Sequence, residues 1–101
     1  MEEKYDTEVL AMTPDAVREV YEYYARSGSM RTSYNGEYYF FDTDGPGPSV
    51  RKSFDNTGDP IFTLPEDEPF INLLDKFKLD GVSIRELLDS GDERFVVEHL
   101  Y

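Results

Sequence analysis

The dipeptide Asn35-Gly36 constrains the fold of this chain more than any other feature, because it separates two short segments of alternating character. Asparagine and glycine tolerate the positive φ values of a type I′ turn, which joins two antiparallel strands through two residues. If Tyr34 pairs with Glu37 across this turn, six residues share the face that we expect to meet the core: Met30, Thr32, Tyr34, Glu37, Tyr39 and Phe41. Four residues share the opposite face: Arg31, Ser33, Tyr38 and Phe40. We expect the two aromatic side chains of this second face to be partly exposed or covered by a helix.

A helix is predicted over residues 13–27, directly before the hairpin. Thr13 can cap its first turn, Pro14 can occupy that turn without losing a needed donor, and Gly28 can end the helix. Residues spaced three and four apart give this helix one buried stripe: Val17, Val20, Tyr21 and Tyr24. Met12 and Val17 stand at the spacing of a hydrophobic staple.

Turn-forming residues divide the segment that follows the hairpin. The stretch "DTDGPGPS", residues 42–49, ends the second strand, because glycine and proline cluster there and proline cannot donate to a sheet ladder. Two more strands, "SVRKSF" and "PIFTL", flank the turn-rich stretch "DNTGD". The sequence therefore predicts an antiparallel meander of three or four strands.

The pattern becomes helical again after Pro65. One stripe, with Pro69 near its start and Gly81 beyond its end, contains Phe70, Leu73, Leu74 and Phe77. A second helix is signalled by a capping box of Ser83 and Glu86 and by Gly91 as terminator. In the tail, four residues alternate as in a strand, although the tail is short enough for a final helical turn or two: Phe95, Val97, His99 and Tyr101.

These segments predict a single compact α+β domain over residues 1–101. An N-terminal helix packs on a small antiparallel β-meander of three to four strands, and two short C-terminal helices and a possible last strand follow. The length allows one domain, and a content of 39% hydrophobic and 15% aromatic residues is too high for a disordered chain. The acidic N-terminus resembles no signal peptide, and no apolar run approaches the roughly 18 residues of a membrane span. We therefore expect a cytoplasmic protein that does not bind membranes.

No catalytic, cofactor-binding or metal-binding residue is predicted. The absence of cysteine excludes disulfides, thiolate ligands and a cysteine nucleophile. Asp42, Asp44 and Gly45 resemble the start of a calcium loop, but prolines occupy the positions where further ligands are needed. His99 is the only histidine and is expected at the surface. With no phosphate-binding glycine loop either, the sequence does not indicate an enzyme.

Charge gives the main functional indication. The chain has 22 acidic and 10 basic residues, a formal net charge of -12, which disfavours direct binding of nucleic acid or anionic lipid and favours basic protein surfaces. The same acidity also fits adaptation to a salty environment. It is shared between the two parts of the chain: residues 1–65 carry 12 acids and 6 bases, and residues 66–101 carry 10 acids and 4 bases.

The acids of the C-terminal part are the candidate partner-binding residues, since at helical spacings they could imitate neighbouring phosphates. They are Glu66, Asp67, Glu68, Asp75, Asp80, Glu86, Asp89 and Glu93. Tyr38 is added as an aromatic anchor, and it is expected outside the core together with Tyr23 and Tyr101.

The leading hypothesis is a small acidic intracellular protein that inhibits a nucleic-acid enzyme stoichiometrically, by occupying its basic surface or by mimicking nucleic acid. Phage anti-defence proteins and toxin immunity proteins act in this way. One alternative is a housekeeping or regulatory protein-interaction module whose acidity is environmental. The other is a small enzyme without a recognisable motif.

Overall fold

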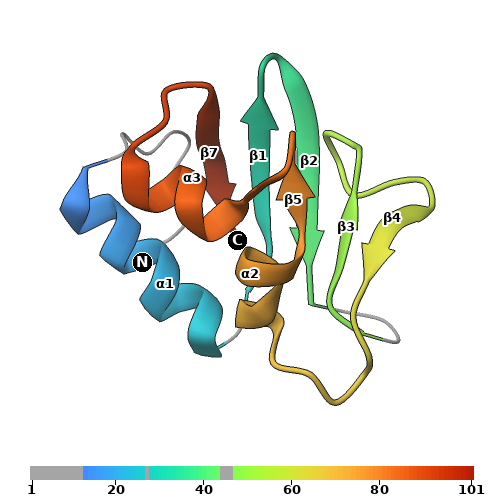
Figure 1. Cartoon of the computed structure of the whole chain (residues 1–101). Coiled ribbons are helices and arrows are strands. Elements are labelled where there is room, and N and C mark those ends of the chain that lie inside the picture. The colour runs from blue at the N-terminus through green and yellow to red at the C-terminus, as the bar shows by residue number, and fades with distance from the viewer. Residues whose placement is uncertain (1–12, 27, 44–46) are drawn as a thin grey trace, which may run out of the picture.

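The computed structural model of the chain describes residues 13–26, 28–43 and 47–101 and shows an α+β fold (Figure 1). The strands of this described part are β1 (Met30–Tyr34), β2 (Glu37–Asp42), β3 (Ser49–Arg51), β4 (Pro60–Thr63), β5 (Lys78–Leu79), β6 (Val82–Ser83) and β7 (Phe95–Leu100). Its helical elements are α1 (Pro14–Arg26), the 3-10 turn η1 (Phe70–Asn72), α2 (Leu73–Lys76) and α3 (Ile84–Ser90). One long helix is thus followed by four antiparallel strands, and then by short helical elements, a small hairpin and a last strand.

The main sheet is antiparallel and has the strand order β4-β3-β2-β1-β7. Strands β1 to β4 form the predicted meander, and Tyr34 pairs with Glu37 across the Asn35-Gly36 turn. Both turn residues have positive φ, 52° and 83°, as a type I′ turn requires. The tail is a strand, as its alternation indicated, and it adds to the sheet beside β1, a position that the sequence did not specify.

A bulge in β7 changes which tail residues reach the core. Arg31 pairs with His99 but Thr32 pairs with Val97, so Glu98 is the extra residue between them. After the bulge the core position passes to Leu100, which is buried, whereas His99 is only partly buried. The uninterrupted alternation predicted through the tail is therefore wrong beyond Val97.

Helix α1 follows its sequence signals closely. The backbone N–H of Ala16 donates to the Thr13 side-chain oxygen at 3.2 Å, which caps the first turn. Val20 and Tyr24 are fully buried. The ring of Tyr24 meets that of Phe41 edge-on, with centroids 6.4 Å apart, and so packs the helix on the sheet. The staple partner Met12 lies outside the described residues.

The second helical prediction is only half right. The stripe from Phe70 to Phe77 forms η1 and α2, but the chain becomes extended at Phe77 instead of continuing toward Gly81. Asp80 and Gly81 have φ of 54° and 78° and turn the tight hairpin between β5 and β6. An Asp-Gly pair favours this turn, so Gly81 makes a hairpin and does not end a helix.

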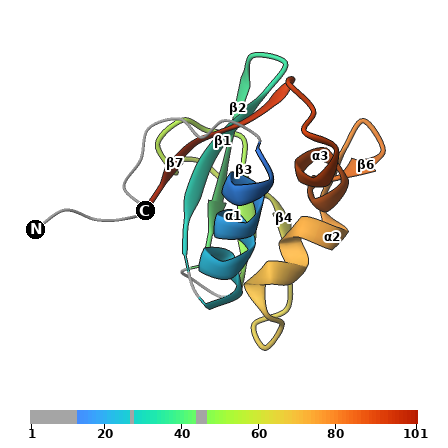
Figure 2. The ribbon, with the colours of Figure 1, turned by 90° about the vertical axis from the view of Figure 1, so that its left-hand side faces the viewer.

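The helices lie on one side of the main sheet, where the core is (Figure 2). The hairpin face predicted to be buried does meet this core through Met30, Tyr34 and Phe41. On the opposite face Phe40 is also buried, at 6% exposure, which corrects the expectation of partial exposure or a covering helix. The ring of Tyr101 lies over it, with centroids 5.4 Å apart.

Two further observations concern the surface. Tyr38 and Tyr101 are exposed as predicted, at 39% and 49%, but Tyr23 is partly buried against the core. Its ring lies over Gly28, where a side chain would collide with it. In the part of the chain that the structure describes, no helix is long and apolar enough to cross a bilayer.

Candidate functional site

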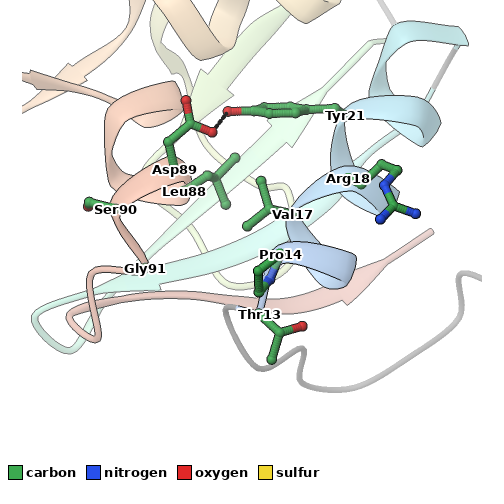
Figure 3. Close-up of a pocket in the computed structure, with 9 residues that line it drawn as sticks. All are labelled: Thr13, Pro14, Val17, Arg18, Tyr21, Leu88, Asp89, Ser90 and Gly91. Carbon is green, nitrogen blue, oxygen red and sulfur yellow. Dashed lines mark hydrogen bonds between the residues drawn. The ribbon is translucent and has the colours of Figure 1, made fainter.

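A groove lies between α1 and α3 (Figure 3). Its volume is about 510 Å³, which is within the usual range for ligand pockets. The residues that line it are Thr13, Pro14, Val17, Arg18, Tyr21, Leu88, Asp89, Ser90 and Gly91. At its base Val17 and Leu88 point toward each other from the two helices, Leu88 fully buried and Val17 partly buried. The groove is therefore apolar in its middle, with polar side chains at its margins.

A hydrogen bond between Tyr21 and Asp89 connects the two helices at one end of the groove. The Tyr21 hydroxyl donates to the Asp89 carboxylate at 2.6 Å and lies 3.3 Å from the carbonyl oxygen of Arg85 (Figure 3). Burial raises the pKa of the Tyr21 hydroxyl far above its usual value, and the bonded carboxylate adds to this shift. Tyr21 therefore stays protonated at neutral pH and remains a donor to Asp89.

Contacts between residues close in the sequence fix both ends of α3. The Ser83 side chain accepts a hydrogen bond from the backbone N–H of Glu86 at 3.2 Å, and the Glu86 carboxylate reaches back to the Ser83 N–H. Gly91 ends the helix with φ of 67°. Because both ends are fixed, Glu86 and Asp89, which are three residues apart, lie on one side of a short helix.

A second hollow of about 410 Å³ lies on the outer side of α3 and is lined by Val82, Glu86, Leu87, Asp89, Ser90 and Asp92. It brings three carboxylates together, and Asp89 lines both hollows. Asp92 is paired with Arg94 at 2.7 Å. Hydrogen bonds from the Arg94 side chain and backbone lower the pKa of Asp92 to about 2. Glu86 and Asp89, in contrast, make no ion pair within the described residues.

The other predicted acids differ in how far their charge is compensated. Glu68 pairs with Lys76 at 3.1 Å, and Asp75 pairs with Arg85. Hydrogen bonds from Asn72 and Lys76 lower the pKa of Glu68, and a hydrogen bond from Arg85 lowers that of Asp75. These two carboxylates thus already have cations of the same chain as partners.

Three of the remaining predicted acids are exposed and form no ion pair in the part of the chain described: Glu66, Asp67 and Glu93. Asp80, at the tip of the β5–β6 hairpin, accepts a hydrogen bond from the Tyr34 hydroxyl at 3.0 Å. Among the predicted acids, only Glu86 and Asp89 line a common hollow.

Tyr38 belongs to a different surface. It lies on the sheet face opposite the helices, and its ring meets that of Phe54 with centroids 4.9 Å apart. The Arg31 guanidinium lies 4.2 Å from the centre of the Phe54 ring and donates to the Tyr101 hydroxyl at 2.9 Å. Tyr38 and the acids of α3 therefore do not form one site.

Sequence reasoning missed the groove itself. The spacing of Val17 and Tyr21 indicated a buried stripe, and the capping box indicated α3. No local signal showed that these two helices are neighbours, because residues 64 and 68 positions apart meet there. Arg31 was expected on the same hairpin face as Tyr38, but Phe54 was not predicted to join them, since a loop brings Phe54 over the sheet.

The described residues contain no group of three or more histidine or acidic side chains placed to hold a metal ion. Asp44 and Gly45 of the calcium-like stretch lie outside those residues. Comparison of the chain with protein-family models, with curated proteins and with solved structures gives no match.

Proposed function

We propose that this chain is an acidic intracellular binding protein that inhibits a nucleic-acid enzyme, such as a nuclease, by occupying its basic surface. The observation that carries the proposal is the placement of Glu86 and Asp89 beside two adjoining hollows at α3, with no ion-pair partner in the described part of the chain. A concave surface with uncompensated charge is suited to bind an oppositely charged protein.

The surrounding charges support this assignment. Arg85 and Arg94, the basic residues next to α3, are already paired with Asp75 and Asp92. The region from residue 66 to residue 94 contains nine acidic residues and four basic ones, so it stays negative after pairing. Such a surface attracts cationic partners over a Debye length of about 8 Å at physiological salt and accelerates their association.

Inhibition requires only that the basic groove of the enzyme is covered. Glu68 and Asp75 are bound to cations of their own chain, so a continuous row of phosphate-like charges is not the basis of the proposal. The mechanism is competition, in which the carboxylates at α3 meet arginine and lysine side chains that otherwise hold nucleic acid.

The opposite sheet face supports a second candidate function, a protein-interaction module whose acidity is environmental. Tyr38 and Phe54 are 39% and 50% exposed there, and such aromatic side chains are common anchors of interfaces. A partner bound at this face would not require a basic surface.

The two candidates are separated by capture from host extract at low and high salt with three forms of the chain. The wild type is compared with the double variant Glu86→Gln/Asp89→Asn and with the control Glu22→Gln/Asp59→Asn. The control removes the same charge from exposed positions that line neither hollow.

We expect the wild type and the control to capture, at low salt, a basic protein whose nuclease or nucleic-acid-binding activity falls on complex formation. The α3 variant should lose this capture. Equal capture by all three forms would contradict the inhibitor proposal, and loss of capture with Tyr38→Ser alone would favour the second candidate.

A further inference from the structure

The groove between α1 and α3 has the form of a helix-binding site. Two helices form its walls, and the Tyr21–Asp89 hydrogen bond marks one end. The start of α1 at Thr13 and the end of α3 at Gly91 lie toward the other end (Figure 3). Pro14 and Val17 lie between on the α1 wall, the first exposed and the second partly exposed, so apolar side chains spaced by one helical turn can enter there.

The charge at the groove margins is one-sided. On the α1 wall, Arg18 is paired with Asp15 at 2.9 Å, so that wall is close to neutral. On the α3 wall, Asp89 accepts a hydrogen bond from the Tyr21 hydroxyl, a neutral donor, and forms no ion pair within the described residues. Glu86 and Asp92 continue the negative charge along the outer side of α3.

We propose that this groove binds an amphipathic helix with a basic face, contributed by the partner protein. Apolar side chains of that helix would cover Pro14 and Val17, and a lysine or arginine three or four positions away would meet Asp89. The inference rests on the proposed function, and it names the structural element of the basic partner that is recognised.

Other occupants fit the groove less well. On α1, the partly exposed Glu19 and the exposed Glu22 form no ion pair within the described residues, so a second copy would bring like charges to Asp89. An acidic helix would meet the same repulsion. A basic segment without apolar anchors would leave Pro14 and Val17 uncovered and lose the apolar area that the groove offers.

The test uses the full chain and three synthetic 14-residue peptides. The first consists of leucine and lysine, with leucine at helical spacing on one face. The second has the same composition in scrambled order. The third has the first pattern with glutamate in place of lysine. Dissociation constants come from calorimetry at 50 and 300 mM NaCl, and the binding surface comes from NMR shift changes.

We expect the patterned basic peptide to bind at least tenfold more tightly than the scrambled one and to shift the resonances of Val17, Tyr21 and Leu88. Val17→Lys should weaken binding at least tenfold, whereas the matched control Ile61→Lys, at a 52% exposed sheet position, should leave it unchanged. Asp89→Asn, which preserves the apolar floor, should weaken binding up to about fivefold, the size of an exposed ion pair. If Val17→Lys unfolds the chain, the effect of Asp89→Asn on peptide binding and the NMR map of the binding surface still test the proposal.

The experiment distinguishes failure of the helix-binding groove from failure of the proposed basic-surface function. Equal binding of the patterned and scrambled peptides, with loss on Asp89→Asn, would overturn the helix-binding groove and leave the basic-surface function standing. NMR shift changes confined to Tyr38 and Phe54 would also overturn the helix-binding groove and leave the basic-surface function standing. Equal binding of the glutamate peptide would overturn the charge assignment, and no binding by either basic peptide at 50 mM NaCl would overturn both proposals.

Discussion

The Tyr21–Asp89 hydrogen bond offers the sharpest test of how α1 and α3 form the groove. Tyr21→Phe removes the hydroxyl that donates to Asp89 at 2.6 Å but keeps the ring that packs against the core. A hydrogen bond to a charged group contributes about 1.5–3 kcal/mol. Asp89 is exposed and is hydrated again once the bond is lost, so we expect a cost of about 1 kcal/mol.

This cost converts into a measurable shift of the melting temperature. At about 2.1 cal/mol/K per residue, the unfolding entropy of a chain of this length is about 0.2 kcal/mol/K, so the melting temperature should fall by about 5 °C. Asp89→Ala, which removes the acceptor, should cost a similar amount. The double variant should cost little more than either single variant, which corresponds to a coupling energy of about 1 kcal/mol.

Urea and thermal unfolding at pH 7 of the wild type, both single variants and the double variant measure this coupling. Tyr38→Phe is the matched control, because the hydroxyl of Tyr38 bonds to none of the described residues, and its effect should stay within about 0.5 kcal/mol. Additive effects of Tyr21→Phe and Asp89→Ala, within about 0.3 kcal/mol, would refute the view that this contact holds α1 to α3.

The pH dependence follows from the same bond. The pKa of Tyr21 is raised in the folded chain, first by burial and then by Asp89. The hydrogen bond therefore stabilises the folded chain fully below about pH 10, which is the pKa of a tyrosine in the unfolded chain. This stabilisation is lost as the pH rises through the higher pKa that Tyr21 has in the folded chain. Between pH 9 and pH 12 the wild type should lose stability more steeply than Tyr21→Phe, and parallel curves would contradict this reasoning.

Three further predictions concern the elements around α3. Ser83→Ala removes the side chain that caps the Glu86 N–H and should cost about 1 kcal/mol, seen as a lower melting temperature; no change would mean that the cap does not stabilise α3. Gly81→Ala should lower the free energy of unfolding in urea by about 1 kcal/mol. The cost comes from the φ of 78° alone, because a new Cβ would meet no atom within 4 Å. An unchanged free energy of unfolding would contradict the hairpin geometry. The pKa of Asp92 is lowered to about 2 by Arg94, so this pair stabilises the fold above the unfolded pKa near 3.9 and stops doing so as the pH falls through about 2. NMR titration of the Asp92 carboxyl should show it ionised at pH 3, and a midpoint near 4 would exclude the pair.

Local signals in the sequence determined the elements that depend on a few neighbouring residues. Asn35-Gly36 specified the first hairpin and its register, Thr13 the start of α1, and Ser83 and Gly91 the two ends of α3. Each of these works through backbone geometry or a hydrogen bond within four residues. The sequence by itself therefore supplied the order of most elements and the α+β class.

Tertiary structure decided whatever depends on partners far away in the chain. Near Asp80 the sequence pattern predicted a helix with Gly81 beyond its end, whereas in the fold a hairpin forms there, Leu79 is buried, and Asp80 accepts a hydrogen bond from the Tyr34 hydroxyl, 46 positions away. In the tail, pairing with β1 introduced the bulge at Glu98 and brought Leu100 into the core.

The candidate site was decided in the same way. Charge counting identified Glu86 and Asp89, but only the fold showed that Glu68 and Asp75 already have cations as partners. The hairpin pattern had placed Tyr38 on the face opposite the expected core, but only the fold showed that the acids of α3 lie on another surface and that Val17 of α1 lies beside Leu88 of α3. Sequence periodicity fixes which side of an element is apolar, whereas the element that meets this side is selected by the packing of the whole chain.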